Sequence, residues 1–296
     1  MNKSINFGFV ILHYMTQELT EKCVDDLLKK FSSYSIKIII VDNASNNNSG
    51  KKLKEKYANN DIVKIILNNK NEGFARGNNI GFEYLKNNFD IDFMIIMNND
   101  VFIKSDNFLE LTRQIYAKYK YAVLGPDIYA PKLNAHQNPQ EYELPTIESY
   151  KYWIKRYKKI LWKIRFKYLL EKISPISNKK TTTDNVKNVN PKFENKIIKN
   201  CILHGACFIF SKDFIKKREY AFYPNTFLYF EEHILSLQCI NENLPIIYSP
   251  EIKVEHLCHV STEYTYGNGY KKDCMFLTNS IKGMKEYIKL CKYYGK

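Results

Sequence analysis

Four short apolar runs, each followed by a polar cluster, divide the first hundred residues and constrain the fold more than any other feature. Their sequences are FGFVIL (7–12), IKIIIV (36–41), IVKIIL (62–67) and FMIIM (93–97). Short apolar runs of this kind are typical of strands buried on both faces of a parallel sheet. Helical patterns separate them, over residues 16–31, over residues 51–58 and ahead of the fourth run. Strands that alternate with helices predict βαβ units with right-handed crossovers, and therefore an α/β fold.

Each apolar run ends in a small polar cluster, and the carboxyl ends of parallel strands share one edge of a sheet. The clusters are His13-Tyr14, Asp42-Asn43, Asn68-Asn69 and Asn98-Asn99-Asp100. Turn chemistry alone also places Asn and Asp at strand ends, so each single cluster has a purely local explanation. Because open α/β sheets bind ligands beyond these ends, four clusters together favour a ligand cleft. Asp100 is a hard oxygen donor suited to Mg²⁺ or Mn²⁺, and hence to a diphosphate.

Residues 71–81 (NEGFARGNNIG) are interpreted as a glycine-rich loop that leads into a helix. Gly73 and Gly77 would let the backbone come close to a ligand. Arg76 is a candidate partner for a phosphate or carboxylate, and Asn78 is a candidate cap or ligand contact. No GxGxxG follows the first strand, so this is not a dinucleotide fingerprint. It also lacks the Gly-Lys-Ser/Thr of a P-loop.

Charge and cysteine content restrict the expected partners and compartment. The 296 residues include 45 Lys and Arg against 31 Asp and Glu, a net charge of +14. This excess favours polyanionic partners: phosphorylated substrates, an anionic membrane surface or nucleic acid. Seven cysteines without a disulfide-framework spacing favour a reduced, cytosolic compartment. The sequence shows no signal-peptide pattern and nothing close to the roughly 20 apolar residues of a membrane span, so we expect a protein that does not cross a membrane.

Residues 150–173 (YKYWIKRYKKILWKIRFKYLLEKI) predict one long basic amphipathic helix. Its apolar stripe comprises residues 150, 153, 154, 157, 160, 161, 164, 168 and 169, and nearly all other positions are Lys or Arg. Such a helix can lie in the interface of an anionic membrane. It can equally pack on the domain's own core, or contact nucleic acid. The polar stretch that follows, residues 174–196, predicts a mobile loop.

Two further features remain open from the residues alone. Cys201, His204 and Cys207 are zinc-ligand types, with His256, Cys258 and His259 as further donors, but the spacing is not that of a usual Cys/His finger. Cys207 fits better as a small buried hydrophobe. The tail from residue 263 to 296 predicts a lysine-rich helix that could cover an acceptor site, add membrane contact or form a dimer interface.

Several motifs in order resemble the inverting glycosyltransferase family 2, in particular its rhamnosyltransferase-like branch of bacterial surface-polysaccharide enzymes. They are VDNASNNNS (41–49), NEGFARGNNIG (71–81), MNNDV (97–101), GACFIFSKDF (205–214), FLYFEEHILSLQC (227–239) and VEHLCHVST (254–262). The resemblance covers residues 5–262 apart from the middle segment. It implies a GT-A fold: a Rossmann-like mixed, mainly parallel sheet flanked by helices. Residues 1–262 would be the catalytic domain, with a basic insertion at 132–200 and a helical tail at 263–296.

The resemblance also implies roles for particular residues. Asp42 matches the contact to the nucleotide's base and ribose, and Asp100 matches the last member of the DxD-type metal motif. Glu231 and Glu232 match the family's acidic pair, whose second member is usually the catalytic base, and His256 matches a histidine near the metal and diphosphate. The positions implied beside the nucleotide are His13, Tyr14, Asn43, Asn71, Gly73, Phe74, Arg76, Gly77, Asn78, Asn98 and Asn99.

Two departures from the family pattern matter. The metal motif is Asn98-Asn99-Asp100, with one carboxylate where two are common, which predicts weaker metal binding in the absence of a diphosphate. The acidic pair is followed by His233-Ile234, where relatives often carry another acid two residues on. Acids also favour the first turn of a helix for electrostatic reasons, so the pair has a structural explanation as well.

The resemblance and the residues together predict an inverting, metal-dependent glycosyltransferase. The donor would be a UDP- or dTDP-sugar used with Mn²⁺ or Mg²⁺, and the acceptor a hydroxyl of a glycan, often lipid-linked. We expect a cytoplasmic enzyme at the inner face of the cell membrane, in contact with anionic lipid and without nucleic acid. A homodimer is left open. The alternatives are a basic nucleic-acid- or membrane-binding protein without catalysis, and a nucleotidyltransferase, which should carry a Gly-rich turn after the first strand.

Overall fold

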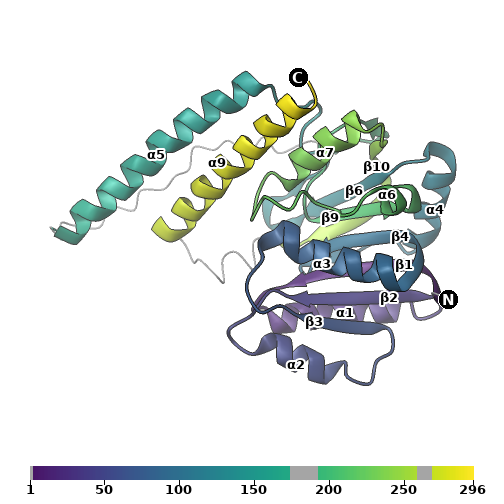
Figure 1. Cartoon of the computed structure of the whole chain (residues 1–296). Helices are drawn as coiled ribbons and strands as arrows, with labels where there is room; N and C mark the ends of the chain where they lie inside the picture. The colour runs from purple at the N-terminus through teal and green to yellow at the C-terminus, as the bar shows by residue number, and fades with distance from the viewer. Residues whose placement is uncertain (1–2, 174–192, 259–268) are drawn as a thin grey trace.

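A single mixed sheet forms the centre of the molecule, as the computed structural model of residues 3–173, 193–258 and 269–296 shows (Figure 1). Within these residues the strand order is β3-β2-β1-β4-β9-β6-β10-β5, with β7 beside β6 and β8 beside β10. The strands are β1 (Lys3–His13), β2 (Ile36–Asp42), β3 (Val63–Leu67), β4 (Phe89–Asn98), β5 (Val101–Ile103), β6 (Val123–Ala130), β7 (Ala135–His136), β8 (Ile198–Lys199), β9 (Cys207–Ser211) and β10 (Ile246–His256). The four N-terminal strands are parallel, and β9 and β5 run antiparallel to their neighbours. The predicted α/β fold, mixed and mainly parallel, is confirmed.

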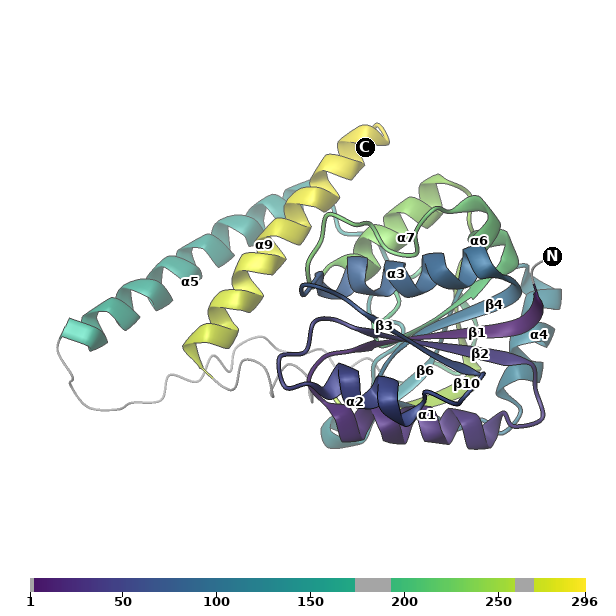
Figure 2. The same cartoon turned by 60° about the horizontal axis from the view of Figure 1, so that its bottom comes forward.

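Helices cover both faces of the sheet (Figure 2). The helices are α1 (Gln17–Lys30), α2 (Ser49–Lys56), α3 (Gly73–Asn88), α4 (Phe108–Tyr119), α5 (Ile147–Ile173), α6 (Lys212–Lys217), α7 (Glu231–Asn241) and α9 (Tyr270–Tyr293), with a 3₁₀ turn at Pro131–Leu133. Buried residues of α1, α2 and α4 share one core with the sheet, and those of α3, α6 and α7 share the other. Because both faces are covered, the central strands are apolar on both sides, as their sequences predict.

The strand register brings the polar clusters to one edge, as expected. His13 of β1 pairs with Asp42 of β2, and Leu12 pairs with Asn98 of β4. Leu67, at the end of β3, pairs with Asp42. The carboxyl ends of the four parallel strands therefore lie at the same level, and the loops that follow them are neighbours.

The basic helix α5 and the C-terminal helix α9 pack side by side and extend away from the sheet (Figures 1 and 2). Tyr150 and Leu161 of α5 share a third core with Met284 and Tyr287 of α9 and with the outer side of α7. Part of the predicted stripe thus packs inside the protein. Other apolar residues of α5 remain exposed: Tyr152, Trp153, Trp162, Phe166, Leu169 and Leu170. No helix among the described residues is long and apolar enough to span a bilayer.

The glycine-rich segment at residues 71–81 is not a loop, which corrects the sequence interpretation. Helix α3 begins at Gly73 and includes Gly77 and Gly81, both buried against β1. A Cβ on Gly77 would lie 2.6 Å from Leu12, and one on Gly81 would lie 2.4 Å from Val10. Glycine at these two positions therefore lets α3 pack closely on the sheet, a requirement that sequence alone does not separate from ligand contact.

Some sequence interpretations concern residues outside the described ranges. These are most of the polar stretch 174–196, the zinc candidate His259, the end of the VEHLCHVST motif and the tail segment up to residue 268.

We predict that substitution of Gly81 by Val destabilises the protein by about 2 kcal/mol or more, because the new side chain would overlap Val10 of β1. The measurement is the free energy of unfolding from urea denaturation. Glu83→Val, at an exposed position of the same helix, is the matched control and should change stability by less than about 0.5 kcal/mol. Equal stability of the two variants would contradict the close packing of α3 on β1.

Candidate active site

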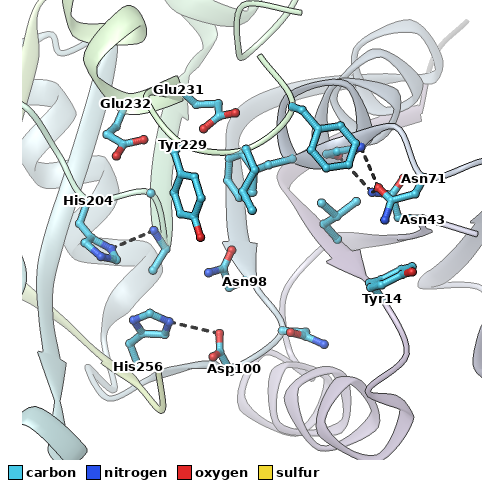
Figure 3. A pocket seen from close by; sticks show the side chains of 18 of the residues that line it. Tyr14, Asn43, Asn71, Asn98, Asp100, His204, Tyr229, Glu231, Glu232 and His256 are labelled. Atoms are coloured by element: carbon cyan, nitrogen blue, oxygen red, sulfur yellow. Dashed lines mark hydrogen bonds and ion pairs between the residues drawn. The ribbon is translucent and has the colours of Figure 1, made fainter. Parts of the chain in front are cut away.

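A cleft of about 320 Å³ lies at the carboxyl edge of the parallel strands (Figure 3). From the strand ends it is lined by Tyr14, Asn43, Asn98, Asn99, Asp100 and His256. From the starts of α3 and α7 it is lined by Asn71, Gly73, Phe74, Glu231 and Glu232. Eleven of the sixteen residues predicted from sequence therefore meet around one cavity. Their role in binding or catalysis stays a prediction.

Asp100 and His256 form a buried pair on one wall of the cleft (Figure 3). His256 Nε2 lies 3.3 Å from Asp100 Oδ1, and His256 Nδ1 lies 2.7 Å from Gln137 Oε1. Burial alone would lower the pKa of His256, but the hydrogen bonds to Asp100 and Cys258 outweigh it and raise the pKa to about 9. Both ring nitrogens face acceptors, which suits an imidazolium that can donate twice.

A series of buried, hydrogen-bonded side chains fixes the side chain of Asn99. Its side-chain amide donates to Thr16 Oγ1 at 2.8 Å and to Thr20 Oγ1 at 2.7 Å. His13 continues the chain, with Nδ1 2.7 Å from Thr20 Oγ1 and Nε2 2.8 Å from Ser49 Oγ. Burial lowers the pKa of His13 to about 4, so its ring is neutral and bridges α1 and α2. His13 does not line the cleft and instead supports the residue next to Asp100.

Asn43 organises the opposite side of the cleft. Its amide nitrogen donates to Asn71 Oδ1 at 2.9 Å and to the Gly73 carbonyl at 3.1 Å. Its amide oxygen accepts from Asn68 at 3.2 Å and from the Glu72 backbone at 2.9 Å. All four hydrogen-bonding positions of the Asn43 amide are thus used within the protein, which fixes the backbone between β3 and α3.

Residues 227–230 form an aromatic segment with strained backbone at the mouth of the cleft. Tyr229 and Phe230 both have φ of 75°, a left-handed conformation that is unusual for bulky residues. The Tyr229 ring packs on Phe276 of α9 at 5.0 Å between centroids. Gly73 lets α3 approach this segment, since a Cβ there would lie 2.3 Å from the Phe227 carbonyl oxygen. The strain is held by these contacts and directs Tyr229 into the cleft (Figure 3).

Glu231 and Glu232 begin α7 on the wall that faces Asp100 (Figure 3). Glu231 is buried, and burial together with the Glu232 charge raises its pKa to about 8. Hydrogen bonds, including one from Thr226, oppose this shift without cancelling it. Glu232 retains a side-chain exposure of 17%. The two adjacent carboxyls therefore differ: Glu231 is protonated at neutral pH, and Glu232 is the one that reaches the cleft from a partly open position.

Five predicted residues do not line the cleft. They are His13, described above, and Asp42, Arg76, Gly77 and Asn78. The Asp42 carboxylate accepts from the Ser45 backbone, and burial raises its pKa. Arg76 Nε donates to the Pro224 carbonyl at 2.8 Å. The structure gives these side chains local contacts, and the nucleotide contacts that the resemblance implies for them stay untested.

Asp100 and His256 are the candidate ligands for a divalent metal in the cleft. Among the described residues, no group of three or more His, Cys, Asp or Glu side chains is arranged to hold a metal ion. Asp100 and His256 alone offer a carboxylate and an imidazole at 3.3 Å from each other. Two protein ligands fit an ion that takes its remaining ligands from diphosphate oxygens and water. Cys201 and Cys207, the other zinc candidates, are buried in the core, where burial raises the pKa of each thiol to about 12.

Sequence reasoning missed several residues that line the cleft: Gln137, His204, Gly205 and Tyr229. Gln137 follows the short strand β7, and His204 follows the bridge between Glu141 and Ile202. Both segments lie in the stretch read as irregular or as a zinc candidate, and neither carries a periodic pattern. Tyr229 lies inside the FLYFEE motif, but its side chain points into the cleft because of a left-handed backbone conformation that cannot be predicted from the sequence.

Comparison with known proteins identifies relatives of this fold. The sequence profile described as glycosyl transferase family 2 matches residues 9–174. Among curated proteins, no sequence matches the chain significantly. Similar solved structures include GalNAc-T7 with UDP, GalNAc and Mn²⁺, with a TM-score of 0.59 and 13% identity over 99% of this chain and 50% of that chain.

S. aureus TarS is a second structural neighbour, with a TM-score of 0.52 and 13% identity over 88% of this chain and 38% of that chain. The TarS 1-349 structure in complex with UDP gives a TM-score of 0.50 and 12% identity, over 85% of this chain and 60% of that chain. This chain thus spans between 38% and 60% of the length of these structures. At such identities the likeness establishes the fold, which is GT-A.

We predict that Glu231→Gln stabilises the protein increasingly as pH rises from about 4.5 to about 8. Folded Glu231 keeps its proton up to about pH 8, whereas the unfolded chain releases it near pH 4.5, so wild-type stability falls across this window. Glutamine carries no such penalty, and the difference should reach the order of 4 kcal/mol at pH 8. The measurement is urea unfolding at pH 5 and pH 8, with exposed Glu18→Gln as control. A pH-independent difference between Glu231→Gln and wild type would contradict a neutral buried carboxyl.

Proposed function

The chain belongs to glycosyl transferase family 2, and from this premise we propose that it is an inverting glycosyltransferase. It transfers a sugar from a UDP- or dTDP-sugar to a hydroxyl group of a glycan acceptor. The observation that carries the proposal is the arrangement of the cleft: Asp100 and His256 lie on one wall and Glu232 on the wall opposite. A leaving diphosphate and an incoming hydroxyl require groups of these two kinds on opposite sides of the sugar.

Asp100 and His256 bind the diphosphate end of the donor in this proposal. Asp100 would hold a Mn²⁺ or Mg²⁺ ion, whose charge would offset the negative charge of the leaving diphosphate. His256 contributes either as a ligand or, as an imidazolium, by donating Nε2–H toward a phosphate oxygen. Gln137 orients the ring through the hydrogen bond at Nδ1. Asn98 also faces this part of the cleft and can donate its amide to the diphosphate.

Glu232 acts as the general base. Its carboxylate accepts the proton of the acceptor hydroxyl as the new bond forms to the anomeric carbon and the bond to the diphosphate oxygen breaks. Attack from the side opposite the leaving group inverts the anomeric centre. Glu231 is unsuited to this task, because its buried carboxyl already holds a proton at neutral pH. We propose that it supports the start of α7 and the aromatic segment before it.

The nucleotide part of the donor would occupy the end of the cleft formed by Tyr14, Asn43 and the segment from Asn71 to Phe74. The Asn43 hydrogen bonds hold this segment in place before any ligand binds, which lowers the cost of ordering it. Asp42 remains the candidate for the base and ribose contact that the family resemblance implies. Reaching a nucleotide would require its carboxylate to leave the Ser45 backbone.

The acceptor and the cellular setting are proposed at the level of class. We propose a role in capsule, O-antigen or other surface-polysaccharide synthesis, in the rhamnosyltransferase-like branch, with a lipid-linked acceptor and a cytoplasmic site of action. Residues 1–262 would be the catalytic unit, with the insertion at 132–200, and residues 263–296 the tail. Helix α5 of the insertion packs on α9 of the tail, which supports describing the insertion and the tail as one helical subdomain.

The exposed side of α5 supports peripheral contact with an anionic membrane. At about 100° per residue, Trp162 and Phe166 lie about 120° and 160° around the helix from Tyr150, which packs on α9, and exposed Leu169 lies beside them. Trp162 is 64% exposed and stacks on Phe166 at 5.3 Å. Exposed Lys and Arg residues flank this face: Lys155, Lys158, Lys159, Lys163 and Arg165. Apolar residues between cations match the lipid interface and its anionic headgroups.

A basic binding protein without catalysis is the second candidate, favoured by the +14 charge and by α5. It predicts salt-sensitive binding to any polyanion and no binding of nucleotide sugars.

We predict that the purified chain releases UDP or dTDP from at least one nucleotide sugar in the presence of Mn²⁺. A suitable panel contains UDP-glucose, UDP-galactose, UDP-GlcNAc and dTDP-rhamnose. Asp100→Asn and Glu232→Gln should each lower turnover by about 100-fold or more, because they remove the metal-binding carboxylate and the base. Asp106→Asn and Glu83→Gln, two exposed carboxyls away from the cleft, should leave turnover unchanged. Full activity of both cleft variants would refute the assignment of the site.

We also predict that the protein sediments with vesicles of phosphatidylcholine and phosphatidylglycerol but not with phosphatidylcholine alone. Replacing Trp162 and Phe166 together by Ser should weaken this binding by about tenfold or more, because it removes the apolar anchor. Tyr293→Ser, at an exposed aromatic of α9, is the control. Unchanged binding of the double variant would exclude this face. A change from dimer to monomer, measured by light scattering, would instead identify it as a contact between two copies.

A further inference from the structure

His233 lies between two carboxylates at the back of the cleft. Its Nδ1 is 3.7 Å from Glu232 Oε1, and its Nε2 is 3.3 Å from Glu141 Oε1. The His233 side chain is only 7% exposed, whereas Glu141 is 46% exposed. The three side chains thus form a line from the cleft to solvent that passes through one buried imidazole.

The two ring nitrogens of His233 are in different situations. Nε2 is within hydrogen-bonding reach of Glu141, so it can carry the ring proton and donate it. Nδ1 is buried and has no hydrogen-bond partner among the described residues. A lone pair on Nδ1 facing an ionised Glu232 gives no attraction, which agrees with the 3.7 Å separation. Once Glu232 gains a proton, the same two atoms become a donor and an acceptor.

The proposed reaction creates a need for such a path. Glu232 takes one proton from the acceptor in each turnover, while the donor and acceptor fill the cleft. Its side chain is 17% exposed in the open cleft, and that exposure faces the volume that the substrates would occupy. The base therefore loses its contact with water at the moment when it must pass on a proton.

We propose that His233 relays the proton from Glu232 to Glu141, which releases it to solvent. The acceptor O–H proton moves to Glu232 as the bond to the anomeric carbon forms and the bond to the diphosphate breaks. Glu232 then donates to Nδ1, and the proton on Nε2 passes to Glu141 and to water. After the products leave, Glu232 is again open to water and carries the Nδ1 proton back into the cleft, while Glu141 takes a proton from solvent and donates it to Nε2. This restores the starting tautomer, and the net release per turnover is the one proton of the acceptor hydroxyl.

Two aromatic rings pack beside His233. Phe230 packs at 5.1 Å and Tyr150 of α5 at 6.2 Å between ring centroids. Burial, followed by the charges of Glu141 and Glu232, raises the pKa of Tyr150 far above its usual value, so this hydroxyl keeps its proton. Glu232 and Glu141 thus contact the two ring nitrogens, and the tyrosine beside the ring stays neutral.

Glu141 is held in position by its backbone. Its carbonyl accepts from the Ile202 backbone at 2.8 Å, and the two residues form an antiparallel bridge. The exposed side chain can therefore be changed without loss of this anchor. Glu141→Gln is accordingly a variant that tests the relay with little risk to the fold.

The inference rests on the proposed function, and its test uses the full chain with Mn²⁺ and whichever sugar nucleotide of the panel is turned over. His233→Gln should lower kcat by tenfold or more, with the donor KM within twofold of wild type. Glu141→Gln should lower kcat less, by about threefold or more. In both variants kcat should rise with the concentration of imidazole buffer, because a small buffer can take the proton in place of His233. Glu143→Gln, two residues away and exposed, is the control.

Each outcome decides one question. If His233→Gln and Glu141→Gln both keep wild-type kcat while Glu232→Gln is inactive, the relay is wrong and the base assignment stands. If Glu232→Gln is itself active, the proposed function's site is wrong. A fall in kcat without any response to imidazole, in a folded variant, would assign His233 a structural role and overturn the relay. If His233→Gln does not fold, the response of Glu141→Gln to imidazole decides alone.

Discussion

The parallel register of the first strands is the constraint on which the candidate site depends. Because His13 pairs with Asp42 and Leu12 pairs with Asn98, the loops after three strands begin at one level and face one cavity. A slip of one residue would turn every side chain of a strand to the opposite face of the sheet. Both faces are buried under helices, so such a slip would also disrupt two cores. Packing thereby fixes the position of Asp100 well before any ligand is present.

The wall of the cleft that carries Glu231 and Glu232 depends instead on hydrogen bonds from α3. Helix α3 holds the segment before α7 by four hydrogen bonds between residues far apart in the sequence, two of them made by Asn79. They join Phe74 to the Phe227 carbonyl, Arg76 to the Pro224 carbonyl and Asn79 to the Phe222 backbone. This segment carries the strained Tyr229 and Phe230 and leads directly into Glu231. The polar residues of the glycine-rich motif thus position the wall that bears the proposed base, a role distinct from direct contact with a nucleotide.

The sequence predicted the strands and their polar ends because these are local signals with a regular period. It failed where a residue's role depends on distant partners. Gly77 was interpreted as a loop residue near a ligand, but its neighbour is Leu12, 65 positions earlier in the chain. Gln137 and Glu141 carry no motif, and only the pairing of their segments with β6 and Ile202 brings Gln137 to the cleft and Glu141 to His233. In α5 the apolar pattern was correctly identified as helical, but periodicity cannot tell which apolar face meets α9 and which meets solvent.

Helix α5 connects the cleft with the exposed apolar face around Trp162 and Phe166. Its first turn packs Tyr150 against Phe230 and His233, beside the proposed base, while Trp162 and Phe166 lie three to four turns further on. A helix held at one end by the cleft and exposed at the other orients the cleft relative to whatever surface its far end contacts. If that surface is a bilayer, a lipid-linked acceptor approaches from the side of α5, and Glu141 lies near its first turn. The proton would then leave beside the insertion, away from the nucleotide end of the cleft, so that proton release and donor exchange do not compete for one opening.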